Sequence, residues 1–383
     1  MQKRFAPDEG GAFPEWEEIE FGKLFQRRSE KNGEEFGVDK TISVATMHFK
    51  PEGNKADEKS LPKYKVMRTG DIAFEGHINK HFKHGRFVLN DIGDGIISPI
   101  FEVLQPVSEL SKEVPEFWKY YINYEPVMGK ILAKCANTGI MMNRLAIKDF
   151  YKQKIKVPCI EEQRKIAAVL AAYDEMIAVK TAKLETWQEC KKRMVKEIFG
   201  RTKRFKDDDG REFPEWEEKT LGEIVSITTG KLNANEMVDG GQFDFYTSGV
   251  DVFKIDKAAF DGPAITVAGN GANVGCLHLA DGKFNAYQRT YVLQDFIACR
   301  EYIYAAIEVT LPNVIKKYKR GSAIPYIVMD MLTDLKIPLP CMEEQQKIGS
   351  FLAEIDKEIQ IQKEFIKTYA EGKKRMMREL MEG

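Results

Sequence analysis

Two stretches of the chain, beginning near residues 160 and 342, carry hydrophobic residues at alternating spacings of four and three. In each stretch, eight of ten positions in this series are apolar over about five heptads. A 3.5-residue period sustained over this length is typical of a coiled-coil helix. The predicted seam and subunit-interface residues are Ile166, Leu170, Tyr173, Ile177, Leu184, Trp187 and Met194, followed by Ile348, Leu352, Ile355, Ile359, Ile366, Tyr369 and Met376.

The ends of both stretches carry helix signals. Pro158 and Pro340 precede them, paired glutamates fall in the first turn, and basic residues near the end complement the helix dipole. We therefore predict two long spacer helices, over residues 156–200 and 336–383, each a rod of roughly 60 Å. We expect them to pack as an antiparallel coiled coil; a bundle core inside one compact domain is the alternative.

Polar residues interrupt the seam at matching positions of the two stretches. Lys180 matches Gln362, and Lys191 matches Lys373. Polar seam residues can set the register and the pairing of helices at some cost in stability. The alternative is that their long aliphatic stems snorkel from a partly exposed seam.

Two blocks of the sequence, here called the frame, each occur twice. The motif Phe-Pro-Glu-Trp-Glu-Glu at residues 13–18 recurs at 213–218. Residues 154–200 match residues 336–382 without a gap, with 20 of 47 positions identical. Chance does not produce such a match, so the sequence predicts an internal pseudo-two-fold repeat.

The segments between the repeated blocks differ from each other. In both, short apolar runs alternate with Gly and Asp-Gly turns, which is typical of a mixed α/β (α+β) domain. A predicted helix follows in each, at Pro115–Met128 in the first segment and near Ile297–Val309 in the second. We predict two globular domains, over residues 1–155 and 201–335, each preceding a spacer helix. A repeated frame with different inserts suits two modules that perform one task on different targets.

Basic and amide side chains gather in the predicted loops of both domains. Lys and Arg neutralise phosphates, while Arg, Asn and Gln read base edges. The candidate DNA-binding residues are Lys80, Lys83, His84 and Arg86 in the first domain and Lys231, Asn233, Asn270, Asn273, Gln288, Arg289, Lys316, Lys317, Lys319 and Arg320 in the second. Charge runs are more often solvated faces, so this pattern does not establish DNA binding by itself.

Two further patterns have alternative interpretations. The loop Gly269–Gly275 fits neither a dinucleotide fingerprint nor a P-loop, so it is either a structural turn or a point of close approach to a DNA backbone. His77, His81 and His84 have spacings compatible with a metal cluster. No Cys or carboxylate lies nearby to complete that cluster, and we predict no metal site.

Composition excludes several classes. The 383 residues include 58 basic and 59 acidic ones, so nucleic-acid binding must come from local patches. No apolar run approaches the roughly 20 residues that span a bilayer, and the N-terminus does not resemble a signal peptide. Six cysteines without close pairing indicate a reducing compartment. No methyltransferase, P-loop, zinc-protease or Ser/His/Asp signature is evident, so we predict a protein that is not an enzyme.

These features together resemble the specificity subunit of type I restriction–modification systems, over nearly the whole chain. The most specific feature is the duplicated Pro-x-x-Glu-x-Gln-x-x-Ile block, which runs from Pro158 to Ile166 and begins again at Pro340. The Trp entries that precede Phe21-Gly22 and Leu221-Gly222 are also similar to the family. Further family-like motifs are Gly70–Ile72, Gly95–Pro99, Tyr246–Gly249, Gly269–Gly275 and Tyr291–Leu293.

The resemblance implies a function in host defence and DNA methylation. Each globular domain would be a target recognition domain that reads one half of a bipartite, asymmetric site in double-stranded DNA. The helices would set the half-site spacing and dock two methyltransferase (modification) subunits. The chain itself would hold no cofactor. S-adenosylmethionine would belong to the methyltransferases, ATP and Mg to the restriction/translocase subunits, and the complex would be cytoplasmic, bacterial or archaeal, without a membrane partner.

Two other classes remain open. One is a coiled-coil scaffold whose end domains bind proteins or carbohydrates. The other is an enzyme, such as a nuclease or methyltransferase, whose motif is not evident.

Overall fold

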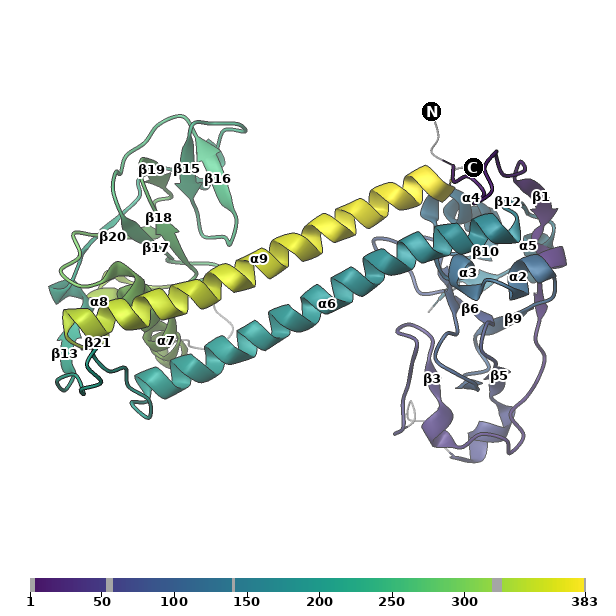
Figure 1. Cartoon of the computed structure of the whole chain (residues 1–383), viewed down its shortest axis with the longest axis horizontal. Coiled ribbons are helices and arrows are strands. Elements are labelled where there is room, and N and C mark those ends of the chain that lie inside the picture. The colour runs from purple at the N-terminus through teal and green to yellow at the C-terminus, as the bar shows by residue number, and fades with distance from the viewer. Residues whose placement is uncertain (1–3, 53–57, 140–141, 319–325, 382–383) are drawn as a thin grey trace. The chain divides into compact units, whose positions relative to one another are not determined.

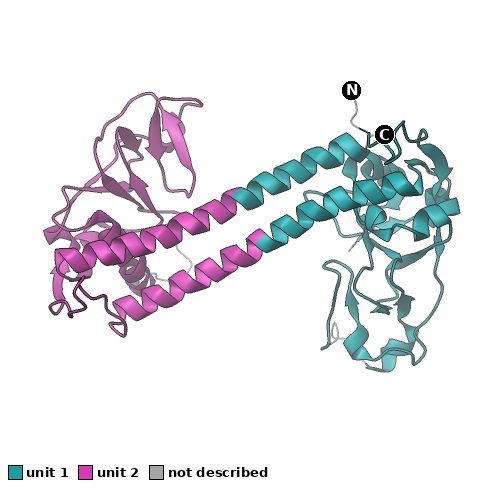
Figure 2. Ribbon diagram, in the orientation of Figure 1, with its two compact units in different colours: residues 1–179, 365–383 teal, residues 180–364 magenta. Residues whose placement is uncertain are grey.

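The computed structural model describes residues 4–52, 58–139, 142–318 and 326–381. It divides into two compact units, residues 1–179 with 365–383 (unit 1) and residues 180–364 (unit 2) (Figure 2). The repeated stretches form two 40-residue helices, α6 (Ile160–Phe199) and α9 (Met342–Met381) (Figure 1). Part of each helix belongs to unit 1 and part to unit 2. Among the described residues, no helix is long and apolar enough to cross a membrane.

Unit 1 is built on a four-stranded antiparallel sheet in the order β2-β9-β6-β7. Its strands are β1 (Glu17–Glu20), β2 (Phe25–Arg27), β3 (Ile42–Ser43), β4 (His48–Phe49), β5 (Lys65–Met67), β6 (Ile72–Glu75), β7 (Arg86–Leu89), β8 (Gly95–Ile97), β9 (Glu102–Pro106), β10 (Ala136–Asn137), β11 (Arg144–Leu145) and β12 (Lys154–Val157). Its helices, besides α6 and α9, are α1 (Phe21–Leu24), α2 (Glu109–Lys112), α3 (Pro115–Tyr121), α4 (Glu125–Cys135) and α5 (Ile147–Tyr151), with 3-10 turns at Val38–Lys40 and Glu58–Lys63.

Aromatic side chains fill the core of unit 1. Phe87 of the sheet packs against Phe21 and Phe150, and α3 adds Phe117 and Trp118, all of them fully buried. The apolar run from Pro115, which alone suggests one helix to about Met128, forms two helices. The chain leaves the helix at residues 122–124, because Pro126 lacks the N–H that would bond the Ile122 carbonyl in a continuous helix and instead lies in the first turn of the second helix.

Unit 2 repeats this plan with a sheet in the order β14-β20-β17-β18, beside a second sheet in the order β16-β15-β19. Its strands are β13 (Glu217–Thr220), β14 (Ser226–Thr229), β15 (Phe243–Tyr246), β16 (Val252–Ile255), β17 (Ala264–Ala268), β18 (Leu277–Ala280), β19 (Phe284–Ala286), β20 (Thr290–Gln294) and β21 (Lys336–Leu339). Its own helices are α7 (Arg300–Tyr318) and α8 (Met329–Thr333), with 3-10 turns at Leu221–Glu223 and Ala234–Glu236. Helix α7 lies against β17, β18 and β21.

A buried carboxylate ties the start of α6 to the N-terminal arm in unit 1. The side chain of Glu162 is 2% exposed and accepts hydrogen bonds from Trp16 Nε1 at 3.1 Å and from Arg4 Nη2 at 2.8 Å. The hydrogen bond with Glu162 raises the pKa of Arg4. Two donors, one of them a cation, compensate a carboxylate that burial alone would destabilise.

Unit 2 contains the same cluster at the start of α9. Glu344 is fully buried and accepts from Trp216 Nε1 at 2.9 Å and from Arg204 Nη2 at 2.8 Å. Around it, strand β13 pairs with β21 as β1 pairs with β12 in unit 1. The structural repeat therefore extends beyond the Phe-Pro-Glu-Trp motif to the arginines at residues 4 and 204.

The long helices run antiparallel within each unit. Ile166 and Leu170 share a core cluster with Leu380 and Met381 in unit 1. Each of the predicted seam residues is at least half-buried. The buried members are Ile166, Leu170, Met194, Ile348, Leu352, Ile355 and Ile359, and the half-buried members are Tyr173, Ile177, Leu184, Trp187, Ile366, Tyr369 and Met376.

Matched ion pairs cross the seam in the two units. In unit 1, Lys373 Nζ lies 2.5 Å from Asp174 Oδ1, and Tyr120 of α3 donates to Asp174 Oδ2 at 2.8 Å. In unit 2, Lys191 Nζ lies 2.8 Å from Asp356 Oδ1 and 2.6 Å from Glu308 Oε2 of α7. The two lysines occupy equivalent repeat positions, and so do the two aspartates. The same lysine–aspartate pair therefore fixes the helix register in both units. A further contact, from Tyr120 in unit 1 and from Glu308 in unit 2, links each helix pair to its own globular domain.

Candidate nucleic-acid interface

A glycine ends the central strand of each sheet and fixes the neighbouring loop. The carbonyl of Gly76, after β6, accepts the N–H of Asn143 at 2.9 Å, and that of Gly269, after β17, accepts the N–H of Ile327 at 2.7 Å. A Cβ at Gly76 would lie 2.0 Å from the Asn143 oxygen, which only glycine avoids. In both units this contact brings the segment after a helix against the end of the sheet.

The basic stretch predicted in the first domain is the β6–β7 loop. Arg86 is engaged inside the protein, with Nε 2.7 Å from Glu75 Oε2 and a further hydrogen bond to the Ala45 carbonyl. Lys80 and Lys83 are exposed and make no side-chain bond within the described ranges, while His84 is half-buried. The two lysines are therefore available to an external anion.

One of the three histidines of this loop contacts a carboxylate. The expectation that no carboxylate lies near these histidines is wrong, because His77 Nδ1 lies 3.5 Å from Glu75 Oε1. Over residues 4–52, 58–139, 142–318 and 326–381, no group of three His, Cys, Asp or Glu side chains is placed to hold a metal ion.

Several amide candidates of the second domain come together at the end of its sheet. Gln288 Nε2 donates to Asn233 Oδ1 at 3.2 Å, and Gln288 N donates to the Leu232 carbonyl at 2.8 Å. Asn270 Oδ1 accepts from Ser248 Oγ at 2.6 Å. These side chains belong to three loops that are far apart in sequence, so the fold assembles a polar surface that spacing alone does not reveal.

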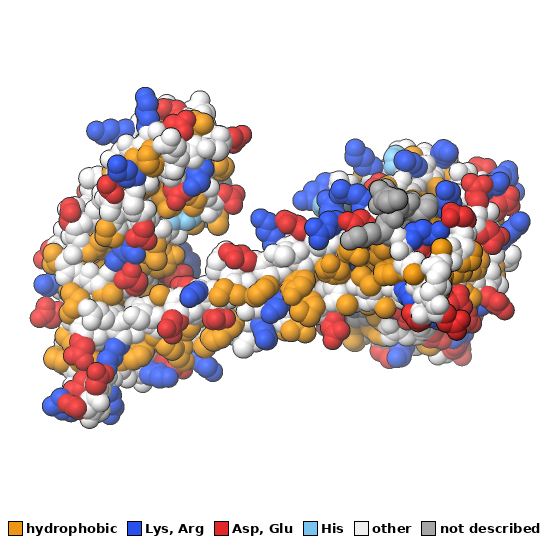
Figure 3. Space-filling view, turned by 45° about the horizontal axis from the view of Figure 1, so that its top comes forward, with side chains coloured by type: hydrophobic (Ala, Val, Ile, Leu, Met, Phe, Trp, Pro, Cys, Tyr) orange, Lys and Arg blue, Asp and Glu red, His pale blue; other side chains and the backbone are white. Residues whose placement is uncertain are grey.

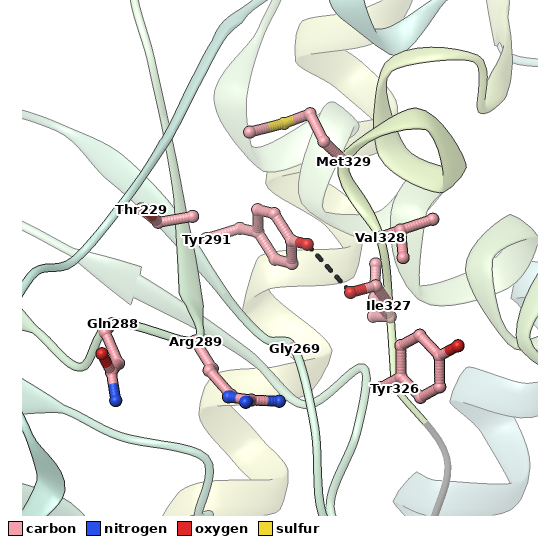
Figure 4. A pocket seen from close by; sticks show the side chains of 9 residues that line it. All are labelled: Thr229, Gly269, Gln288, Arg289, Tyr291, Tyr326, Ile327, Val328 and Met329. Atoms are coloured by element: carbon pink, nitrogen blue, oxygen red, sulfur yellow. Dashed lines mark hydrogen bonds between the residues drawn. The ribbon is translucent and has the colours of Figure 1, made fainter.

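A recess of about 320 Å³ opens beside these amides (Figure 4). Gln288, Arg289 and Tyr326 line it together with Tyr291, whose hydroxyl donates to the Ile327 carbonyl at 2.9 Å. Burial raises the pKa of Tyr291, so the hydroxyl remains a donor at neutral pH. No acidic side chain is among the described residues of the lining. The recess therefore presents amide and guanidinium donors without a competing carboxylate.

The remaining candidates lie elsewhere. Lys231 and Asn273 are exposed on neighbouring loops. Lys316 lines a separate recess of about 530 Å³ between the Gly-rich loop and α7, and Lys317 lines another on the other side of that helix. The sequence candidates Lys319 and Arg320 lie outside the described residues. The second-domain set thus divides into an amide group at the sheet end and a lysine group on α7.

Unit 1 has a recess at the corresponding sheet end, of about 920 Å³. Ile100 and Arg144 line it, and both are exposed. Sequence reasoning missed Arg144 and Ile100, as it missed Tyr326 in unit 2. A single basic, apolar or aromatic residue carries no pattern. The contacts of Gly76 and Gly269 bring Arg144 and Tyr326 into place, and the β6–β9 register places Ile100.

The distribution of charge is visible on one face of the molecule. Basic and acidic side chains are interspersed over the face shown in Figure 3, in keeping with the net charge of −1. The candidates for recognition remain the small groups of side chains that line the two recesses, together with the exposed lysines.

Comparison with known proteins gives consistent results. The type I restriction modification DNA specificity domain matches the chain twice, over residues 15–186 and 214–368. The EcoDI specificity subunit of Escherichia coli is 36% identical over 146 residues. This match covers 37% of this chain and 32% of that protein, so the chain spans about a third of the length of this relative. The MjaVIII specificity subunit of Methanocaldococcus jannaschii is 25% identical over 76% of this chain and 74% of that protein.

The fold is also that of a solved specificity subunit. The S subunit of a type I restriction–modification system from M. genitalium aligns with a TM-score of 0.70 over 98% of this chain and 99% of that one, at 16% identity. At this identity the likeness shows the fold alone. The two domain matches, however, cover most of the sequence. The protein therefore belongs to the type I restriction–modification specificity subunits and carries two DNA specificity domains.

Proposed function

We propose that the chain recognises a bipartite, asymmetric sequence in double-stranded DNA, with each globular domain reading one half-site. The proposal rests on one observation: the two units share the same supporting contacts but carry different loops. The Arg-Glu-Trp clusters at Glu162 and Glu344 are equivalent, whereas the residues around Gly76 and Gly269 differ. Equal frames present equivalent loop positions, and different side chains there select different bases.

The long helices have two roles in this proposal. They fix the half-site spacing, because their register is pinned by Asp174–Lys373 and by Lys191–Asp356. They also dock two methyltransferase subunits. The exposed side chains of Met176 and Val179, 38% and 45% exposed, offer an apolar contact for such a subunit on α6.

The chain contributes recognition and positioning, and its partners contribute the chemistry. Methyl transfer from S-adenosylmethionine would take place on the methyltransferase subunits. Translocation driven by ATP and Mg, with cleavage, would take place on restriction/translocase subunits.

The test is to co-express the chain with the methyltransferase subunit encoded beside it, in a host without other modification, and to sequence the methylated DNA. The expected result is methylation at a split motif with a fixed gap and two different halves. A stable complex that methylates no motif would contradict DNA recognition by this chain, and failure to form any complex would contradict the docking role.

A further inference from the structure

The strand registers identify one loop position as equivalent in the two domains. In unit 1, Phe74 pairs with Glu102, and Gly76 follows two residues after Phe74. In unit 2, Val267 pairs with Tyr291, and Gly269 follows two residues after Val267. Because both glycines make the same backbone contact, Glu102 and Tyr291 are equivalent.

Two residues before Glu102 and Tyr291, the side chains of the two domains differ completely in chemistry. Unit 1 has Ile100, of which 63% is exposed, and unit 2 has the exposed Arg289. Both side chains line the recess at their sheet end. An exposed isoleucine and an exposed arginine at one position of a shared frame have no common structural role, so the position is free to vary for recognition.

The backbone around Arg289 is rigid, although its side chain is free. The Arg289 carbonyl accepts the N–H of Gly269 at 2.8 Å, and the N–H of Gln288 is held by Leu232 at 2.8 Å. The guanidinium makes no hydrogen bond or ion pair to any residue that the structure describes. In the view of Figure 4 it lies between the amide of Gln288 and the ring of Tyr326. A fixed backbone with an unpaired planar donor is preorganised for an external acceptor.

We propose that Arg289 reads a guanine of the half-site bound by unit 2, an inference that rests on the proposed function. The guanidinium fork matches the O6 and N7 acceptors that guanine presents in the major groove, and this bidentate contact is the commonest specific one. Ile100, which offers only an apolar contact, selects differently at the equivalent position of unit 1.

The experiment compares wild-type, Arg289→Ala and Arg289→Lys chains, each co-expressed with the methyltransferase subunit, by sequencing the methylated DNA. In Arg289→Ala, the preference for guanine at one position of one half-site should fall roughly ten- to a hundredfold, while the other half-site stays unchanged. Arg289→Lys keeps the charge and can still donate to the guanine acceptors without the planar fork, so total methylation should stay near wild type and the guanine preference should fall less than in Arg289→Ala. The melting temperature should not change, because the guanidinium makes no internal bond.

Lys283→Ala is the matched control. Lys283 is exposed and follows β18 at the opposite end of the same sheet, so its loss should leave the motif intact. An unchanged motif in Arg289→Ala would overturn the inference. So would a uniform loss of methylation with the motif preserved in both variants, which would assign Arg289 to a phosphate. If the wild-type complex methylates no split motif, the proposed function itself fails, and that result is distinct from either variant outcome.

Discussion

Replacing Glu344 with glutamine should destabilise unit 2 and leave unit 1 almost unaffected. Glu344 is fully buried, and its carboxylate accepts from Trp216 and from Arg204, whose side chain is only 16% exposed. The amide keeps the volume but removes the charge and turns one acceptor into a donor. Breaking a buried, hydrogen-bonded ion pair from one side costs about 3–5 kcal/mol. The partial exposure of Arg204 places the expected loss at the lower end, about 3 kcal/mol.

A loss of this size is measurable. For a unit of this length it lowers the melting temperature by about 6–12 °C. Calorimetry gives the shift, and hydrogen exchange should show faster opening of β13 to β21 with protection retained in β2 to β12. Glu162→Gln should produce the mirror result in unit 1.

Glu215→Gln is the matched control, because Glu215 contacts the same Arg204 but is 88% exposed. It should cost less than about 0.5 kcal/mol. The reasoning is refuted if Glu344→Gln shifts the melting temperature no more than Glu215→Gln does. It is equally refuted if both units lose protection to the same extent, because the cluster would then not act locally.

Three further predictions concern the seam and the basic loop. Asp174→Lys should destabilise the chain by about 1 kcal/mol in urea unfolding, and adding Lys373→Asp should restore most of the loss; a further loss in the double variant would contradict the assigned pair. Burial opposes the charge on Lys191, but its two carboxylate partners outweigh that effect and raise its pKa above the ordinary value of 10.5. The stability that the charged Lys191 contributes is therefore fully present below pH 10.5 and is lost as the pH rises through the raised pKa of the folded state. Urea unfolding from pH 8 to 11.5 should show this loss in wild type, and a similar loss in Lys191→Met would contradict it. The Lys80→Ala, Lys83→Ala double variant should lower the slope of log affinity against log salt by about 1.8 if both lysines contact phosphates; an unchanged slope would remove them from the interface.

Much of the frame can be predicted from the sequence because it is local and periodic. The heptad series predicts α6 and α9, and the repeated Phe-Pro-Glu-Trp motif marks where each globular domain begins. The helical stretch from Pro115 is predicted as helix, but its division into two helices is not. Buried residues continue through the break at 122–124, so the hydrophobic pattern gives no signal of the break.

The site is less predictable because its contacts are long-range. Arg86 has a candidate's composition, but the β6–β7 register places it opposite Glu75, which binds its guanidinium. Conversely, Ile100 gives no sequence signal of its equivalence to Arg289. The segment between β6 and β9 differs in length from the segment between β17 and β20, so only strand pairing aligns the two residues.

The most direct test of the account measures methylation by the assembled complex on duplexes that carry both half-sites with the gap varied by one and two base pairs. If each unit reads one half and the pinned helices hold the units at a set separation, one gap length should be methylated. A change of one base pair should then reduce the rate at least about tenfold, because the second half-site can no longer be contacted without deforming DNA or protein. Equal rates at every gap length, or equal rates when one half-site is scrambled, would contradict it.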